Sequence, residues 1–200
     1  IRPYLDLVAL GTIADLVPLT GENRILPKIG LDRLNRTQRP GLIALKSVSK
    51  SANEIGVYEV GFHLGPRLNA AGRLKSAMVS LELLLADDAD KARAIADKLN
   101  DHNKERQEME RIISGDVVNT VLDKFNPDTD YVIVEGREHW HLGVVGIVAA
   151  RVMRKFYRPS IILGGDGEFL RGSGRSIEGV DLVAALRECD NLLLSHGGHA

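Results

Sequence analysis

One long amphipathic segment, residues 89–125, constrains the fold of this chain more than any other feature. No proline interrupts it, and its apolar residues mostly recur at steps of three, four or their multiples: Ala92, Ile95, Leu99, Met109, Ile113, Val117 and Val121. At about 1.5 Å per residue, such a helix would be roughly 55 Å long. Between residues 100 and 108 its face turns polar, which predicts a stretch that spans two bodies instead of lying on one core.

The sequence patterns on the two sides of this helix differ. Before it, apolar residues favour helices over 24–35, 41–48, 57–64 and 78–85, and a buried helix or strand over 4–14. After it, strand-like runs at 131–134, 159–163 and 169–172 alternate with helical patterns at 143–156 and 180–189. This alternation is typical of an α/β domain. We therefore expect an α/β protein with a helical part (1–88), a connecting helix (89–126) and an α/β domain (127–200).

The composition narrows the class of protein. Apolar residues make up 44% and charged residues 26%, which is ordinary for a globular chain. No apolar run approaches the roughly 20 residues of a membrane span, and no signal peptide opens the chain. The single cysteine, Cys189, fits a reducing cytoplasm, and its helical surroundings predict a buried packing residue.

The charge does not by itself point to nucleic acid. The formal net charge is −1, although residues 1–86 hold 11 Lys and Arg against 7 Asp and Glu. A nucleic-acid groove would therefore have to be built from a few placed arginines instead of a broad basic face.

The segment 65–74, Gly-Pro-Arg-Leu-Asn-Ala-Ala-Gly-Arg-Leu, places Arg67, Asn69 and Arg73 among small residues. Guanidinium groups match phosphate oxygens, and small neighbours let a ligand approach the main chain closely. We expect this segment to be a loop that follows a short helix. Its arginines could instead cap a helix or pair with carboxylates.

Further segments accompany this decapeptide. They are residues 6–15, which end in Gly-Thr-Ile-Ala-Asp, residues 139–151, the Gly-Ser-Gly-Arg-Ser of 172–176, and Gly197-Gly198-His199. In this order and spacing they resemble the RecJ family of single-stranded-DNA exonucleases, over nearly the whole chain. These exonucleases belong to the DHH phosphoesterase superfamily, with a DHHA1 domain after the DHH domain. The resemblance implies that 1–88 is the C-terminal part of a DHH domain and that 127–200 is a DHHA1 domain truncated at its C-terminus.

The resemblance also implies a two-metal site for Mn²⁺ or Mg²⁺, to which Asp15 supplies a catalytic, metal-binding carboxylate. From its position alone, Asp15 could instead cap a helix or form a turn, and Asp6 is expected to orient its neighbours. The sequence contains no Asp-His-His, and one carboxylate cannot hold two metals. Since the chain begins at Ile1 inside an apolar run, we expect a fragment that lacks most metal ligands and is inactive alone.

For nucleic-acid binding, the resemblance implies that Arg67, Asn69 and Arg73 line the DNA path. From the DHHA1 side it implies phosphate contacts from Arg175, Ser176, Gly197, Gly198 and His199. The alternative for Gly-Ser-Gly is an ordinary turn between strands. His141 precedes a predicted helix start, which favours a bound anion, but it could equally only cap that helix. We expect Trp140 to pack and not to stack on a base.

The resemblance as a whole implies a metal-dependent 5′-to-3′ exonuclease. Such an enzyme hydrolyses single-stranded DNA to mononucleotides in DNA repair and recombination. It would be cytoplasmic and not bound to membranes, with helicases or single-strand-binding proteins as candidate partners and an undetermined oligomeric state. One alternative is a DHH–DHHA1 phosphodiesterase of short oligonucleotides or cyclic dinucleotides, which the Arg-Asn decapeptide disfavours. The other is a catalytically inactive RecJ relative that serves as a binding subunit.

Overall fold

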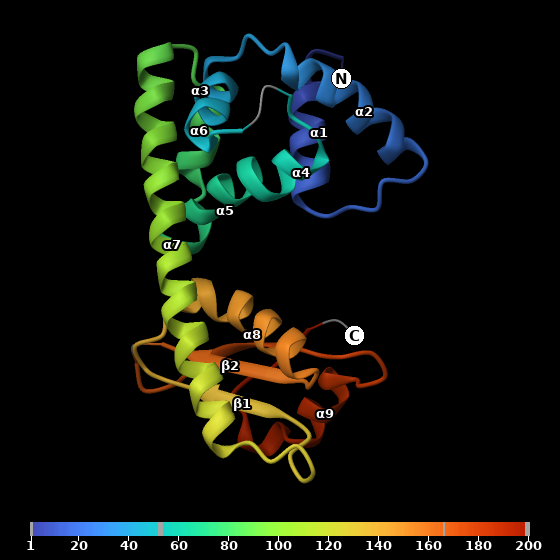
Figure 1. Ribbon diagram of the computed structural model, residues 1–200, viewed down its shortest axis with the longest axis vertical. Coiled ribbons are helices and arrows are strands. Elements are labelled where there is room, and N and C mark those ends of the chain that lie inside the picture. Colours follow the sequence, from blue (N-terminus) through green and yellow to red (C-terminus); the bar gives the residue numbers. More distant parts are fainter. Residues whose placement is uncertain (1, 52–53, 166, 199–200) are drawn as a thin grey trace. The chain divides into compact units, whose positions relative to one another are not determined.

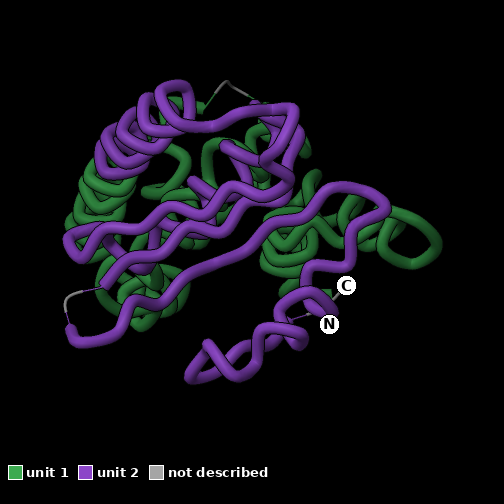
Figure 2. The backbone as a smooth tube through the Cα atoms, turned by 90° about the horizontal axis from the view of Figure 1, so that it is seen from below, with its two compact units in different colours: residues 1–106 green, residues 107–200 purple. Residues whose placement is uncertain are grey.

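The computed structural model describes residues 2–51, 54–165 and 167–198. These residues form two compact units, Ile1–Arg106 and Gln107–Ala200, shown in two colours in Figure 2. The boundary lies inside the long helix α7, Ala89–Lys124, so this helix contributes residues to both units. The three-part division expected from the sequence stays a prediction.

The described residues of unit 1 form helices and no strands (Figure 1). They comprise η1 (Arg2–Tyr4), α1 (Leu5–Ala14), α2 (Glu22–Asn35), α3 (Pro40–Ser49), α4 (Val57–Glu59), the π-helix η2 (Val60–Leu64), α5 (Gly65–Leu74), α6 (Met78–Leu85) and the first half of α7. The expected helices are thus confirmed, and residues 5–14 are helical.

The core of unit 1 forms where α1 and α2 pack together and the other helices close over them. Leu10, Leu34, Leu45 and Leu99 are all buried there, which supplies the main stabilisation of the unit. Gly30 sets the closeness of α1 and α2, because a Cβ at this position would stand 2.1 Å from the Leu5 carbonyl oxygen. The amphipathic spacing read from the sequence therefore marks the faces that are buried.

Residues 65–74 are a helix, so the expected loop was wrong. Glycine and proline usually punctuate secondary structure, which is why the segment looked irregular. Here Pro66 lies in the first turn of α5, where its missing N–H is not needed. Ala70 and Ala71 are buried and anchor the helix to the core. Most backbone amides of this segment are therefore used within the helix and are not open to a ligand.

Unit 2 combines the second half of α7 with a three-stranded sheet. Its further elements are β1 (Ile133–Gly136), α8 (Leu142–Phe156), β2 (Ser160–Gly164), β3 (Arg171–Arg175), α9 (Leu182–Glu188) and η3 (Asp190–Leu192). The strand order is β1-β2-β3, in which β1 pairs parallel to β2 and β3 pairs antiparallel to it. Helix α8 connects β1 to β2 and packs on β2 and β3 (Figure 1). The expected α/β class is confirmed.

The third strand begins later than expected, at Arg171 in place of residue 169. As a result Ser173, Gly174 and Arg175 pair with β2 and do not form a turn. Gly172 is required by this close pairing, since a Cβ there would lie 2.6 Å from the Ile162 carbonyl oxygen. Trp140 is buried, which confirms its expected packing role.

One expectation about burial was wrong. Cys189 is exposed, because α9 buries none of its residues and the cysteine only ends that helix. The boundary between the two units, after Arg106, falls within the polar stretch 100–108 of α7, in which His102 and Asn103 are buried. Within the described part of the chain, no helix has both the length and the apolar character needed to cross a membrane.

Candidate functional sites

A small hollow in unit 1 brings together two of the predicted site residues, Asp15 and Asn69. It measures about 240 Å³, and its walls come from α1, α5 and α6: Leu7, Leu10, Gly11, Ala14, Asp15, Gly65, Leu68, Asn69 and Leu84. Gly65 allows α5 to approach the end of α1, because a Cβ there would lie 3.1 Å from the Ala14 Cβ. Two motifs that lie far apart in the sequence therefore form one site.

The end of α1 holds Asp15 in a defined position. Its N–H donates to the Gly11 carbonyl at 3.0 Å, and the N–H of Val17 donates to Thr12 at 3.2 Å. Leu16 has a φ of 56°, the left-handed conformation that usually ends a helix on glycine. Asp15 is exposed, and within the described residues its carboxylate makes no hydrogen bond or ion pair. Backbone hydrogen bonds therefore end the helix, and the Asp15 carboxylate takes no part in capping and is available to a ligand.

The residues of this chain do not by themselves fit a two-metal centre. Across residues 2–51, 54–165 and 167–198, no group of three or more His, Cys, Asp or Glu side chains could hold a metal ion. Asp15 could contribute one carboxylate ligand to a site completed by residues outside this chain.

Arg67 points into unit 1 and contacts three other elements. Its Nε donates to Asn100 Oδ1 of α7 at 3.0 Å, and its Nη1 donates to the His63 carbonyl at 2.7 Å. Its Nη2 lies 3.5 Å from the Val48 carbonyl at the end of α3. Burial lowers the pKa of Arg67, which reflects the desolvation of its charge. The guanidinium thus joins α3, η2 and α7 to α5.

Asn69 and Arg73 lie one turn apart on α5, and both are exposed. They therefore share a face of the helix, and Asn69 belongs to the wall of the Asp15 hollow. The structure brings Asn69, but not Arg73, into that wall.

In unit 2, Arg175 lies against the first turns of α8. Its Nη1 donates to Ser173 Oγ at 2.9 Å and to the Gly174 carbonyl at 2.7 Å. A Cβ at Gly146 of α8 would lie 3.6 Å from Arg175 Nη2 and 3.1 Å from Ser173 Oγ, so glycine gives the guanidinium its place there. No described residue accepts a hydrogen bond from Nε or Nη2 of Arg175, which leaves donors for an anion.

A larger hollow of about 960 Å³ collects four predicted residues of unit 2, namely Arg175, Ser176, Gly197 and Gly198. The Ser176 hydroxyl donates to the Val180 carbonyl at 2.7 Å, so its proton is already used. The predicted residue His199 lies outside the described residues.

His141 is the N-cap of α8. Its Nδ1 accepts a hydrogen bond from the Gly143 N–H at 3.1 Å. In the neutral ring this assigns the proton to Nε2, which stays able to donate to an anion. The capping role is confirmed, and the proposed contact with nucleic acid is compatible with it.

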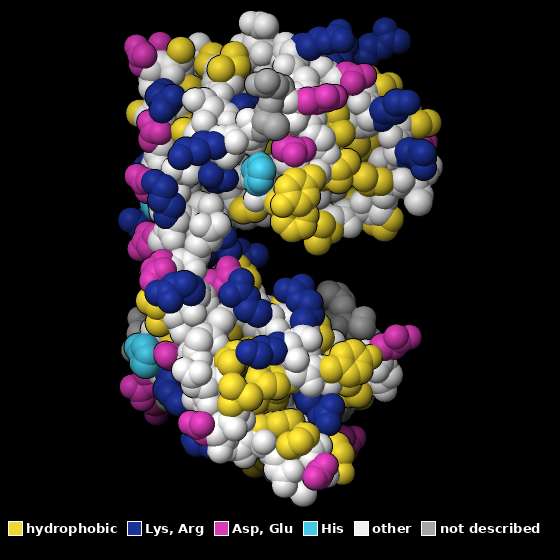
Figure 3. Space-filling model, in the orientation of Figure 1, with side chains coloured by type: hydrophobic (Ala, Val, Ile, Leu, Met, Phe, Trp, Pro, Cys, Tyr) yellow, Lys and Arg dark blue, Asp and Glu magenta, His cyan; other side chains and the backbone are white. Residues whose placement is uncertain are grey.

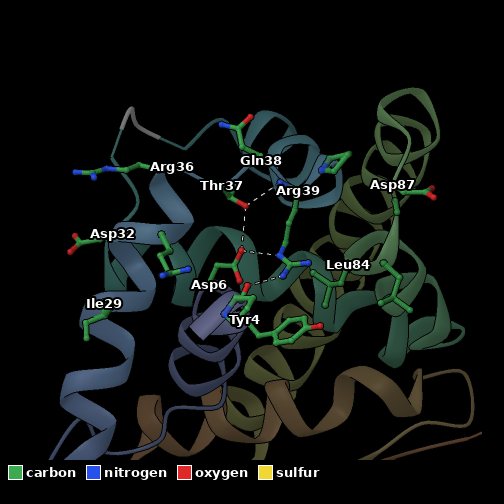
Figure 4. Close-up of a pocket in the computed structure, with 15 residues that line it drawn as sticks. Tyr4, Asp6, Ile29, Asp32, Arg36, Thr37, Gln38, Arg39, Leu84 and Asp87 are labelled. Atoms are coloured by element: carbon green, nitrogen blue, oxygen red, sulfur yellow. Dashed lines mark hydrogen bonds and ion pairs between the residues drawn. The ribbon is translucent and has the colours of Figure 1, made fainter. Parts of the chain in front are cut away.

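Another hollow of unit 1, about 1040 Å³, has Asp6 among its lining residues (Figure 4). Asp6 is buried and accepts hydrogen bonds from Arg39 Nε at 3.0 Å and Thr37 Oγ1 at 3.3 Å. The Arg39 guanidinium also lies 5.3 Å from the centre of the Tyr4 ring. Asp6 therefore orients its neighbours, as the sequence predicted, and is not one of the residues that line the Asp15 hollow.

Basic side chains are interspersed with acidic ones on the visible faces of both units, without one continuous basic patch (Figure 3). This agrees with the expectation that any anion site depends on a few placed arginines.

Ser173 and Gly146 position Arg175, although no sequence motif singles them out. For Ser173 the alternation of β3 is a signal, since residues 173 and 175 share one face of that strand. The expected strand, 169–172, ends before both residues, and no local pattern marks Gly146 of α8.

No protein-family model matches the sequence. Among curated proteins, the chain is 44% identical over 200 residues to the single-stranded-DNA-specific exonuclease RecJ of Bacillus subtilis (strain 168), with 98% of this chain and 25% of that protein covered. It is 42% identical over 207 residues to RecJ of Escherichia coli (strain K12), of which it covers 36%. RecJ of Thermus thermophilus is 39% identical over 197 residues, 28% of its length.

The solved structures that are similar to this chain are also structures of RecJ proteins. The crystal structure of RecJ in complex with Mg²⁺ from Thermus thermophilus matches with a TM-score of 0.87 and 38% identity, covering 98% of this chain and 30% of that one. A crystal structure of exonuclease RecJ bound to manganese matches with a TM-score of 0.83 and 38% identity, covering 98% and 48%.

The described fold is that of a mixed α/β protein in which a helical unit and a small-sheet unit share one long helix. The chain belongs to the RecJ family, as its likeness to several RecJ proteins over 98% of its length shows. It spans about a quarter to a third of the length of the curated relatives cited above.

Proposed function

We propose that the whole protein is an exonuclease that hydrolyses phosphodiesters of single-stranded DNA. The observation that carries this proposal is the 44% identity to a single-stranded-DNA-specific exonuclease over 98% of the chain. The hollow that joins Asp15 to Asn69 and the free donors of Arg175 give this chain groups suited to such a substrate. The resemblance further supports 5′-to-3′ cleavage to mononucleotides in DNA repair and recombination, a cytoplasmic location, and helicase or single-strand-binding partners.

The proposed cofactor of the whole protein is Mn²⁺ or Mg²⁺, the ions named for the similar RecJ structures. Such ions would supply Lewis-acid chemistry at the phosphate. Within this chain, Asp15 would contribute a ligand, and the remaining ligands would come from elsewhere in the protein.

In this proposal the DNA strand is bound by residues of both units. They are Asn69, Arg73, His141, Arg175, Ser176, Gly197, Gly198 and His199. Arg175 and His141 would act as hydrogen-bond donors to phosphate, from the strand β3 and from the start of α8. Arg67 would serve as a positioning residue, because its guanidinium already donates to protein acceptors on three elements.

Replacing Arg73 or Arg175 with alanine should weaken binding similarly for unrelated DNA sequences. If each contacts one phosphate, the slope of log affinity against log salt should fall by about 0.7 for a single strand. Titrating the whole protein with two oligonucleotides at several salt concentrations measures this slope. The Arg111→Ala variant is the control, since Arg111 pairs with Glu108 on α7. Unchanged slopes in both variants would place the strand elsewhere.

The 200-residue chain by itself should not cleave DNA. Its described residues hold no cluster of three metal-binding side chains, and one carboxylate cannot form a two-metal centre. The assay is release of mononucleotides from 5′-labelled single-stranded DNA with Mn²⁺, with the whole protein as the positive control. Metal-dependent release by the pure chain would show that it holds a complete site.

A further inference from the structure

Gly11 lies in the interior of α1, where glycine weakens a helix relative to alanine. No close contact among the described residues requires a glycine at this position. A Cβ at Gly11 would meet no atom of the described residues within 4 Å, whereas a Cβ at Gly30 would collide with the Leu5 carbonyl oxygen at 2.1 Å. Gly115 of α7 has equally free space, so it is the hollow lined by Gly11, and not the free space alone, that suggests the close approach of a separate molecule to the backbone at this point.

The space beside Gly11 is the hollow that contains Asp15. Gly11 forms part of its wall, and Asp15 follows four residues later on the same face of α1. Apolar side chains, Leu7, Leu10 and Leu68 among them, form most of the remaining wall, and Asn69 adds an amide that both donates and accepts. Ligand sites commonly combine apolar walls with a few polar groups in this way.

The size of the hollow limits what can enter it. At about 240 Å³ it is smaller than the roughly 300–1,000 Å³ of most complete ligand sites, so it suits one unit of a longer ligand. The sugar and base of a nucleotide have apolar faces and polar edges, which match the leucine walls and the Asn69 amide.

We propose that Gly11 is a specificity-determining residue, whose missing side chain makes room beside Asp15 for the sugar and base of one nucleotide of the DNA strand. This inference rests on the proposed function, since it assumes that a single strand is the substrate. It assigns to the α1 backbone a direct contact with that strand.

The first test compares Gly11 with a second exposed glycine inside a helix, far from the Asp15 hollow in the sequence. Gly115 of α7 is also in a helix interior and exposed, and a Cβ there also meets no atom within 4 Å. In the whole protein, Gly11→Ala should lower kcat/KM on single-stranded DNA by about tenfold and Gly11→Leu by about 100-fold, by the steric exclusion of one or several carbon atoms. Gly115→Ala and Gly115→Leu should leave it within about twofold.

The stability of α1 should change in the opposite direction. Because alanine favours a helix, hydrogen exchange of the α1 amides in Gly11→Ala should slow by up to about fivefold. Faster exchange would mean that another part of the protein fills the hollow, which would overturn the proposal. Wild-type kcat/KM in Gly11→Leu would also overturn it.

The second test measures occupancy without catalysis. Gly11→Cys and Gly115→Cys are each made in the whole protein, a thiol reagent is added in EDTA, and labelling of the introduced cysteine is followed by peptide mass spectrometry. A saturating single-stranded oligonucleotide should slow labelling of Gly11→Cys by at least about tenfold and leave Gly115→Cys unaffected. Fluorescence anisotropy follows binding of the same oligonucleotide. Binding without protection overturns the role of Gly11 alone, whereas no binding to the wild type overturns the proposed function as well.

Discussion

Replacing Asp15 with alanine in the whole protein is expected to abolish nuclease activity and to leave the fold intact. Loss of a group that only orients a metal ligand costs roughly 10–100-fold, so loss of a ligand itself should lower kcat by more than about 100-fold. The carboxylate makes no hydrogen bond within the described residues, so stability should change by less than about 0.5 kcal/mol. Binding of single-stranded DNA in EDTA should persist.

Three measurements test this expectation: nucleotide release with Mn²⁺, anisotropy with a labelled oligonucleotide, and thermal unfolding. Asp32→Ala is the matched control, because Asp32 is an exposed carboxylate of α2 that lies outside the Asp15 hollow. Asp6→Ala should behave in the opposite way, since it breaks the buried contact with Arg39 and destabilises unit 1. Wild-type turnover by Asp15→Ala would show that Asp15 only ends a helix.

Replacing Arg67 with alanine should cause a large loss of stability. The change leaves Asn100 Oδ1 without this donor and removes the contacts with the His63 and Val48 carbonyls. Hydrogen bonds from charged groups contribute about 1.5–3 kcal/mol each, and the losses are not additive, so we expect about 2–4 kcal/mol in total. Urea unfolding of the chain, followed by circular dichroism, measures this loss.

Two companion variants sharpen the test of Arg67. Arg36→Ala removes an exposed arginine at the end of α2 and should change the free energy of unfolding by less than about 0.5 kcal/mol. Arg67→Lys keeps the charge but loses the planar fork, so its stability should be intermediate. Suppose instead that Arg67→Ala is as stable as the wild type and lowers the salt slope of DNA binding by about 0.7. Arg67 would then contact a phosphate.

Periodicity predicted most elements of the fold because it records which face of each segment is buried. The apolar spacing of 24–35 and 78–85 corresponds to α2 and α6, and the β-branched run at 131–134 overlaps β1. The segment 65–74 was predicted less well, since its glycines and Pro66 usually mark loops. Burial of Ala70 and Ala71 inside unit 1 outweighs those local preferences for a loop.

The candidate sites were predicted as residue types and not as geometry. The motifs singled out Asp15, Asn69 and Arg175, but their spacing could not show that Asp15 and Asn69 share one hollow. Nor could it show that Ser173 and Gly146 hold Arg175 in place. These contacts join residues that are distant in sequence, and no local pattern records them.

The sequence by itself determined the helical and α/β parts of this protein, the long helix α7 and the segments that resemble RecJ. Local spacing and short motifs carry that information directly. Only the tertiary structure decided the direction of each candidate side chain. A guanidinium can donate equally well to a phosphate or to a carbonyl, and the packing of α3, η2 and α7 around Arg67 selects the carbonyls. Packing also leaves Asp15 exposed beside Gly11, where no atom of the described residues fills the space next to the glycine.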